Sequence, residues 1–227
     1  MTDTFRRTGR TTATRLRDRV SYDRARAHAI LDEAYHCHLG FVVDGQPRVL
    51  PTLHVRIGDT AYVHGSTGSR PMLTARAAGG LPVCLTVTLL DGLVYARSQF
   101  HHSANYRSVV AHGTAYPVRD EAVKRAVLAA LVEKLGAGRS ADSRAPTVRE
   151  LAQTDVLALA LREVSVKCRD GGVNDEDADL ALPHWAGVVP LRLAAGPPVA
   201  DSAARRPPPS YLPGVATAPG PRESAAA

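Results

Sequence analysis

Short apolar segments separated by tight turns fill much of this chain, and the short connections restrict the folds open to it. Segments typical of strands lie at 36–43, 48–57 and 61–65, with Asp44-Gly45 and Gly58-Asp59 between them. Such pairs favour tight hairpin turns, whereas neighbouring parallel strands need crossover connections of a dozen or more residues. The pattern therefore predicts an antiparallel meander.

The same pattern continues through the rest of the chain, interrupted by a few helical segments. Strands are expected at 82–90, 93–100, 108–118 and 155–168, with a turn at Asp91-Gly92 and the last strand closing the sheet. Helical spacing of apolar residues predicts helices over 24–35, 72–78 and 120–135. The expected fold is mainly β, or α+β: a sheet curled into a small barrel with a few peripheral helices, since closure removes exposed edges.

Composition divides the chain into a body and two ends. Between Met1 and Arg26 there are eight arginines and three aspartates, so most of the net charge of +6 lies there. From Gly196 onward the chain holds eight of its 16 prolines, a composition typical of disorder. We therefore expect a flexible basic arm at 1–20, one folded domain at 21–195 and a disordered tail at 196–227.

Several functional classes fit the sequence poorly. The basic arm lacks the interleaved aromatic residues of single-strand binders, so no nucleic-acid partner is expected. No apolar run approaches the length of a membrane helix and no signal peptide is apparent, which predicts a cytoplasmic protein without a membrane partner. Cys37, Cys84 and Cys168 form no CxxC pair, and no metal site is predicted. GxGxxG and GxxxxGK motifs are absent as well, which argues against Rossmann and P-loop nucleotide sites.

The segment from His64 to Arg70, HGSTGSR, has the parts of a phosphate-binding loop. A predicted strand ends at His64, two glycines free the backbone, and Arg70 stands at the start of a predicted helix. Amides at a helix N-terminus attract anions, and an arginine can hold a phosphate bidentately. Gly/Ser loops between a strand and a helix are also common for structural reasons alone, so this pattern leaves both interpretations open.

A second polar stretch, SQFHHSANYRS at 98–108, separates two apolar segments. It carries far more hydrogen-bonding groups than a connector needs and contains no Gly, Pro or Lys. We therefore interpret it as a binding loop.

Taken together and in this order, the motifs HCHLGFV, DGQPRVLPT, YVHGSTGSR, TVTLLDGLVYARS, HHSANYRSVV and HWAGVVPL resemble those of flavin-nucleotide-binding proteins of the pyridoxamine-phosphate-oxidase-related superfamily. The resemblance runs from about Tyr22 to Leu191. It implies a split β-barrel that forms a homodimer, with FMN in two symmetric clefts at the interface.

The resemblance also implies which residues bind the cofactor. One strand would lie along the isoalloxazine ring and the ribityl chain, one loop would bind the phosphate, one segment would come from the partner subunit, and one ring would lie near the cofactor. In that order these are Arg48, Val49, Leu50, Pro51 and Thr52; His64, Gly65, Ser66, Ser69 and Arg70; Asn105, Tyr106, Arg107 and Ser108; and Trp185.

Two departures from the family pattern bear on the activity. Pro71 stands where relatives often have a lysine after the loop arginine, and the chain ends in a Pro-rich segment rather than one that reads a substrate phosphate. We therefore expect a nitroimidazole-reductase-like FMN oxidoreductase acting on an unassigned small molecule, such as a nitro or quinone-like acceptor. His102 and Tyr106 are candidate proton donors, since an imidazole titrates near neutrality and a phenol can donate in a dry cleft.

Two alternatives remain open at this stage. His36 and His38 flank Cys37 on a predicted strand, so both imidazoles point to one face. Such a face permits haem ligation, together with His54, His64, His101 or His102, and some split barrels of this superfamily bind haem. The other alternative is a flavin carrier without catalytic activity, because function depends on the site rather than on the barrel.

Overall fold

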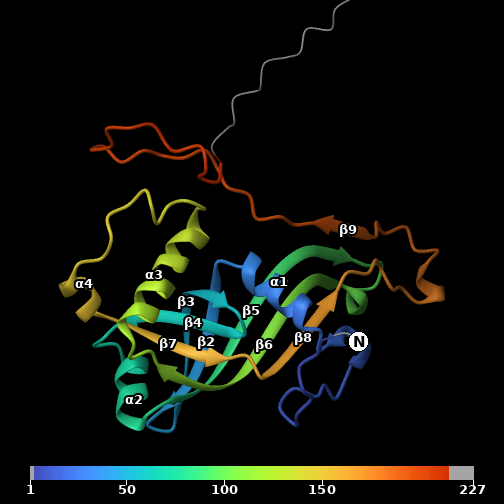
Figure 1. The fold of residues 1–227 in the computed structure, drawn as a ribbon. Coiled ribbons are helices and arrows are strands. Elements are labelled where there is room, and N and C mark those ends of the chain that lie inside the picture. The colour runs from blue at the N-terminus through green and yellow to red at the C-terminus, as the bar shows by residue number, and fades with distance from the viewer. Residues whose placement is uncertain (1–2, 215–227) are drawn as a thin grey trace, which may run out of the picture.

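The computed structural model describes residues 3–214, and its centre is a closed antiparallel barrel (Figure 1). The strands are β1 (Val20–Ser21), β2 (His36–Val43), β3 (Gln46–Ile57), β4 (Thr60–Ser66), β5 (Leu81–Tyr95), β6 (Ser103–Pro117), β7 (Thr154–Ala160), β8 (Glu163–Arg169) and β9 (Gly187–Pro190). The helices are α1 (Arg24–Glu33), α2 (Arg70–Ala78), α3 (Glu121–Leu135) and α4 (Val148–Ala152). Six strands close the barrel in the order β6-β7-β4-β3-β2-β5, because β5 pairs with both β2 and β6.

Alternation along the strands fills this barrel. In β2 the side chains of Cys37, Leu39 and Phe41 are buried, while His36 and His38 between them are exposed. Successive side chains of a strand point to opposite faces, so the buried set enters the core and the other set covers the outside. The expected barrel with peripheral helices is confirmed in this arrangement.

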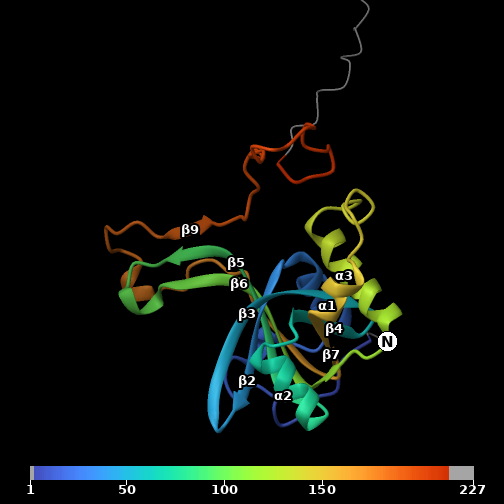
Figure 2. The same cartoon turned by 90° about the vertical axis from the view of Figure 1, so that its left-hand side faces the viewer.

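Strands β5 and β6 are long enough to form part of the barrel and to extend beyond it. Their outer ends leave the barrel as an arm, where β9 adds to β5 (Figure 2), whereas β8 pairs with the middle of β6, from Tyr106 to His112. The turn predicted at Asp91-Gly92 is wrong: β5 runs through it with only an irregularity in the pairing between Leu90 and Gly92. Pairing with β6 and β9 on both sides, and the ion pair of Asp91 with Arg107 at 2.8 Å, favour a continuous strand over a hairpin.

Two further expectations differ from the structure, and the expected disordered tail stays a prediction. The long strand predicted at 155–168 is two strands, β7 and β8, which pair with different parts of β6. The segment expected as a flexible arm packs on the body instead, with Phe5 buried in the core cluster. From the expected disordered tail, residues 196–214 form no helix or strand, although Tyr211 donates a hydrogen bond to Asp142 at 2.6 Å; residues 215–227 lie outside the described part.

Helix α3 covers the outer face of β3, β4 and β7. Its Val127 and Leu131 pack with Val55 and Val156 in a second, smaller core outside the barrel. No helix within residues 3–214 is both long and apolar enough to cross a membrane. The cytoplasmic location stays a prediction.

A buried polar contact joins α1, β3 and the end of α3. The carbonyl oxygen of Leu31 accepts hydrogen bonds from Lys134 Nζ at 2.8 Å and from His54 Nε2 at 2.9 Å. His54 is fully buried, and its burial together with the charge of Lys134 lowers its pKa to about 4. Burial also lowers the pKa of Lys134 to about 8. The imidazole is therefore neutral in the folded protein at neutral pH.

This contact predicts how stability depends on pH. The unfolded chain binds a proton on His54 near its ordinary pKa of 6.5, whereas the folded protein binds it only near 4. Lowering the pH through this window therefore favours unfolding, by up to about 3 kcal/mol at the lower end. Denaturant unfolding of His54→Gln at pH 7, 5.5 and 4.5 is expected to lose this part of the pH dependence. The exposed His38→Gln serves as control. If the free energy of unfolding of His54→Gln falls with pH as steeply as that of the wild type, the assignment is contradicted.

Candidate cofactor site

Strand β4 ends in the predicted phosphate loop, and the loop has the geometry of an anion site. The first hydrogen bond of α2 runs from the Leu73 amide to the Ser69 carbonyl, which leaves the amides of Arg70 and Met72 free at the helix start. Ser69 Oγ is buried and has no hydrogen-bond partner among the described residues. A Cβ on Gly65 would lie 3.2 Å from Met72 Cε, so the close approach of the loop to the helix favours glycine there.

Arg70 lies at the mouth of this loop, where its only contact among residues 3–214 is weak. Its guanidinium is 3.3 Å from the carboxylate of Asp44 on the β2–β3 hairpin, and both side chains are more than half exposed. Such a surface pair contributes little to stability, so Arg70 can be diverted to a ligand at low cost. Free amides, an unpartnered hydroxyl and an available guanidinium together suit a phosphate.

The residues predicted to lie along the flavin belong to the first half of β3. Arg48, Val49, Leu50 and Pro51 are all exposed, and Thr52 is partly exposed. Arg48 and Leu50 pair with Phe41 and Leu39, so they continue the inner face of the sheet beyond the packed core. These residues form an uncovered strip rather than an enclosed cavity.

His64 is placed differently from the prediction. It precedes the loop on β4, but its side chain lies on the outer face beneath α3, because Val63 on one side of it enters the core. There it lines a cavity of about 610 Å³ between α3, the sheet and the segment 140–150. His64 Nδ1 is buried without a hydrogen-bond partner among the described residues, and burial lowers the pKa of the imidazole. The expected phosphate role of His64 is therefore corrected.

The segment Asn105–Ser108 is not brought to the phosphate loop within one chain. It lies on β6, and β2 and β5 separate it from β3. Asn105 is buried and accepts a hydrogen bond from Arg169, while Ser108 Oγ donates to the Lys167 carbonyl at 3.0 Å. The stretch interpreted as a loop is a strand from Ser103 onward.

Arg107 already forms ion pairs with two carboxylates in the described chain. Its Nη2 atom donates to Glu33 and to Asp91, both at 2.8 Å, and these hydrogen bonds raise its pKa. Arg107 therefore ties α1 to the β5–β6 arm. Tyr106 lies beside it on the opposite face of β6, where its cross-strand neighbour is Leu90.

Trp185 lies on the outer arm rather than beside the phosphate loop. Its ring is 5.9 Å from that of Tyr95, which is 5.8 Å from the ring of His102. His102 Nδ1 is 3.0 Å from the Ser98 carbonyl oxygen, and both Trp185 and His102 are exposed. The two candidate proton donors, His102 and Tyr106, thus belong to the arm.

The predicted histidine face is confirmed on β2. The rings of His36 and His38 meet edge to face at 5.6 Å on the outer side, whereas Cys37 is buried. His54 does not join them, because it points inward. Within residues 3–214, no three His, Cys, Asp or Glu side chains come together as a metal site.

The cavity beneath α3 is not predicted from the sequence, although the apolar residues of the helix indicate it. One apolar face was expected on α3, and Val127 and Leu131 do pack in the core. The cavity is lined by Leu131 and Leu135 of that face and by Leu128 and Val132 beyond it. A helix that is apolar over more than one face indicates a second surface to be covered.

Comparisons with known proteins agree with this architecture. A family model described as pyridoxamine 5'-phosphate oxidase matches residues 23–168. The flavocytochrome Anf3 from Azotobacter vinelandii is 38% identical, with a TM-score of 0.83 over 90% of this chain and 95% of that one. The FAD and haem binding protein from Mycobacterium smegmatis is 40% identical, with a TM-score of 0.79 over 86% and 98% of the two chains.

A more distant structure shares the fold alone. A protein described as a candidate 5-nitroimidazole antibiotic resistance protein from Bacteroides thetaiotaomicron is 21% identical, with a TM-score of 0.55 over 65% of this chain and 85% of that one. No curated protein matches the sequence. The resemblance inferred from the motifs is confirmed by the family model, and the chain belongs to the pyridoxamine 5'-phosphate oxidase family of split-barrel proteins.

Proposed function

We propose that this protein is a redox protein that binds a flavin and a haem at two sites served by β4. The observation that carries the proposal is His64, which lines a largely apolar cavity just before the phosphate loop and whose Nδ1 has no hydrogen-bond partner within residues 3–214. Two relatives of 38% and 40% identity support it, since one is a flavocytochrome and the other an FAD and haem binding protein. Haem binding, the alternative from the sequence, thereby joins flavin binding rather than replacing it.

The chemistry of the α3 cavity suits a haem. Leu53 from the sheet and Leu128, Val132 and Leu135 from the helix provide apolar walls for a macrocycle. A volume of about 610 Å³ lies in the range of cofactor pockets. His64 would supply a ligand to the iron, because a neutral imidazole without a competing hydrogen bond is free to bind it.

Two arginines at the rim of the cavity complete the fit. Arg125 pairs with Glu121 and Arg144 pairs with Glu150, each at 2.7 Å on the surface. A guanidinium has five donors, so both can also bind the propionates of a haem. The exposed pair His36 and His38 offers no such walls.

Replacing His64 is expected to abolish haem binding. Purified His64→Ala, reconstituted with haem, should lose the intense near-ultraviolet absorption band that the wild type gains, since the cavity then has no axial ligand. The double variant His36→Ala/His38→Ala is the matched control and should retain the band. The reverse result, loss in the double variant and retention in His64→Ala, would move the haem to the exposed face of β2.

A bound flavin supplies one-electron or hydride transfer, and the chain binds and orients it. The loop Ser66–Arg70 would hold the ribityl phosphate, and the strip Arg48–Thr52 would lie along the ring system. The guanidinium of Arg48 would stabilise negative charge on a reduced flavin ring bound along this strip. The sequence predicts FMN, and both FMN and FAD contain this phosphate.

Removing the loop arginine is expected to weaken flavin binding. Titration of flavin-free protein with FMN, followed by fluorescence quenching, should show about tenfold weaker binding for Arg70→Ala, because one charge-assisted contact is lost. Ser69→Ala should act in the same direction. Arg162→Ala, an exposed arginine between β7 and β8, should have no effect. Unchanged affinity in both loop variants would remove the phosphate assignment.

We also propose that two copies of the chain form a homodimer that completes the flavin site. The strip on β3 and the segment Asn105–Ser108 lie apart in one chain, so a single flavin can contact both only if the second comes from another copy. Beside the hairpin that joins β2 and β3, the outer face of the sheet exposes two apolar side chains, Val42 at 58% and Val49 at 67%. Burial of this face provides the driving force for association.

Light scattering tests this association directly. The wild type is expected at twice the chain mass of 24.1 kDa, and Val42→Asp at the monomer mass, because a charge at an apolar interface is costly. Val148→Asp, exposed on α4, should remain dimeric. A monomeric wild type at micromolar concentration would contradict the proposal.

As an enzyme, the protein would transfer electrons between the flavin and a small acceptor. The proton donors proposed for that reaction are His102 and Tyr106. Both lie on the arm, so they would reach the flavin only across the dimer interface. We propose no specific acceptor: the nitro or quinone-like acceptor expected from the sequence has no recognition group of its own in the described chain.

A further inference from the structure

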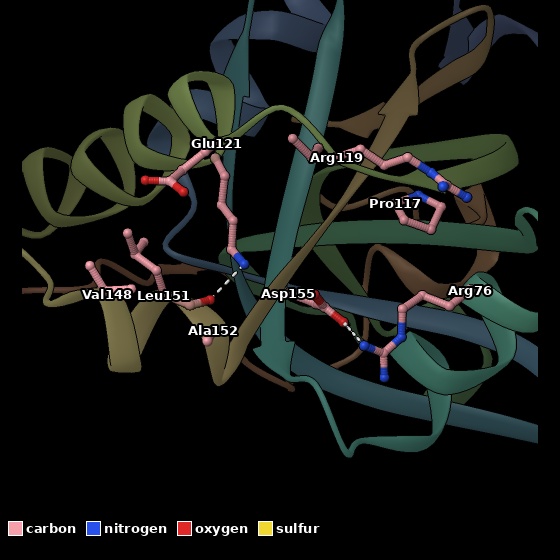
Figure 3. A pocket seen from close by; sticks show the side chains of 10 residues that line it. Arg76, Pro117, Arg119, Glu121, Val148, Leu151, Ala152 and Asp155 are labelled. Carbon is pink, nitrogen blue, oxygen red and sulfur yellow. Dashed lines mark hydrogen bonds and ion pairs between the residues drawn. The ribbon is translucent and has the colours of Figure 1, made fainter.

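A second cavity lies between the end of β6, α2, α4 and the start of α3 (Figure 3). Its volume is about 640 Å³, which is in the range of small-molecule sites. In Figure 3 the side chains of Val148, Leu151 and Ala152 lie on one side, and those of Asp155 and Arg76 lie on the other. The cavity therefore combines an apolar wall with a charged one.

Most of the charges at this cavity cancel in pairs. Arg76 Nη1 is 3.3 Å from the carboxylate of Asp155 on β7. Glu121 lies 2.7 Å from Arg125, which is one turn further along α3 and outside the cavity. A ligand would therefore meet mainly the cations that have no carboxylate partner.

Those cations are Lys124 and Arg119. Lys124 Nζ has one neutral partner, the Leu151 carbonyl oxygen at 2.7 Å, and an ammonium has three donors. The guanidinium of Arg119 is exposed and makes no ion pair within residues 3–214. Both side chains line the cavity, so its unpaired charge is positive and favours an anionic ligand.

The two helices that begin beside the cavity add no donors to it. Asp120 caps α3 and accepts hydrogen bonds from two of its first amides, at 2.8 and 3.1 Å. Thr147 and Glu150 form a capping box at the start of α4. Phosphate sites at helix starts depend on free backbone amides, whereas a carboxylate can bind bidentately to one guanidinium. Side-chain donors alone therefore suit a carboxylate better than a phosphate.

The cavity lies next to the phosphate loop but is separate from it. Arg76 Nη2 donates to the Thr67 carbonyl oxygen at 2.5 Å, so this side chain reaches from the wall of the cavity to the loop. The Thr67 amide donates to the Gln153 carbonyl oxygen at 3.0 Å, next to Ala152 of the apolar wall. Because the backbone of Thr67 lies between the two places, a ligand in the cavity would be a molecule distinct from the flavin.

We propose that this cavity binds a small carboxylate with an apolar body, such as an aromatic acid. The carboxylate binds Arg119 and Lys124, and the apolar body lies against Leu151 and Ala152. This site goes beyond the proposed function, and it needs neither the flavin nor the haem. Its ligand would also contact Arg76, the side chain that connects the cavity to the phosphate loop.

Calorimetric titration of the full-length protein with three ligands tests the site. Naphthoate has both the carboxylate and the apolar body, whereas acetate lacks the rings and naphthylmethanol lacks the charge. Naphthoate is expected to bind about tenfold more tightly than either of the others, because each of them loses one kind of contact.

Variants locate the binding within the molecule. Arg119→Gln is expected to weaken naphthoate binding about tenfold and to leave naphthylmethanol binding unchanged, because only the charged contact is lost. Ala152→Phe, which fills the cavity from an exposed position, should weaken the binding of both by obstruction. Arg162→Gln, an exposed arginine between β7 and β8, is the matched control. Arg70→Ala should bind naphthoate as the wild type does, since the phosphate loop takes no part.

Three results would overturn the proposal. The first is equal affinity of the wild type for naphthoate and naphthylmethanol, or no binding of naphthoate at millimolar concentration. The second is unchanged naphthoate affinity in both Arg119→Gln and Ala152→Phe. The third is weaker binding in Arg70→Ala but not in Arg119→Gln, which would place the anion at the phosphate loop. Each of these results leaves the flavin and haem proposals to their own tests.

Discussion

Two lysines tie helix α3 to α4 and α1, and the two cavities beside α3 depend on where the helix lies. Near its start, Lys124 donates to the Leu151 carbonyl oxygen at 2.7 Å; near its end, Lys134 donates to the Leu31 carbonyl oxygen at 2.8 Å. The ammonium of Lys134 is partly buried, so breaking its contact would leave a costly unpaired charge. One side of the helix forms the wall of the His64 cavity, and its first turn borders the cavity lined by Arg119 and Lys124. The apolar contacts of Val127 and Leu131 hold the helix on the sheet, whereas the lysines fix its position along it.

Strand alternation explains which parts of the site the sequence could predict. The loop at Ser66–Arg70 and the paired faces of His36 and His38 follow from local pattern, because a glycine-rich turn and a period of two need no distant contact. His64 was grouped with the loop because it adjoins it in sequence. Its direction depends on the register of β4 against β7, and on α3 covering that face, which are long-range properties.

Long-range contacts also explain why the turn predicted at Asp91-Gly92 is wrong. Asp91-Gly92 is a favourable hairpin sequence, and in isolation it would turn. In the folded chain the backbone there pairs with β6 on one side and β9 on the other, and Asp91 forms an ion pair with Arg107. Without β9, which has only four residues and a weak pattern, the sequence contains no sign that the strand continues. The arm therefore could not be predicted from the sequence.

Placing both proposed cofactors on β4 has a consequence for electron transfer. His64 and Ser69 are five residues apart, and an extended chain advances about 3.3 Å per residue, so the haem ligand and the phosphate loop lie within roughly 17 Å of one another. The two groups would nevertheless contact different faces of the sheet, because His64 points under α3 while Arg48 and Leu50 continue the inner face. One short strand would thus keep the two proposed cofactors close and separate their environments, an apolar cavity for one and an open strip for the other. Access of a small acceptor to the flavin would be governed by the dimer interface that completes its site, and access to the haem by the segment 140–150.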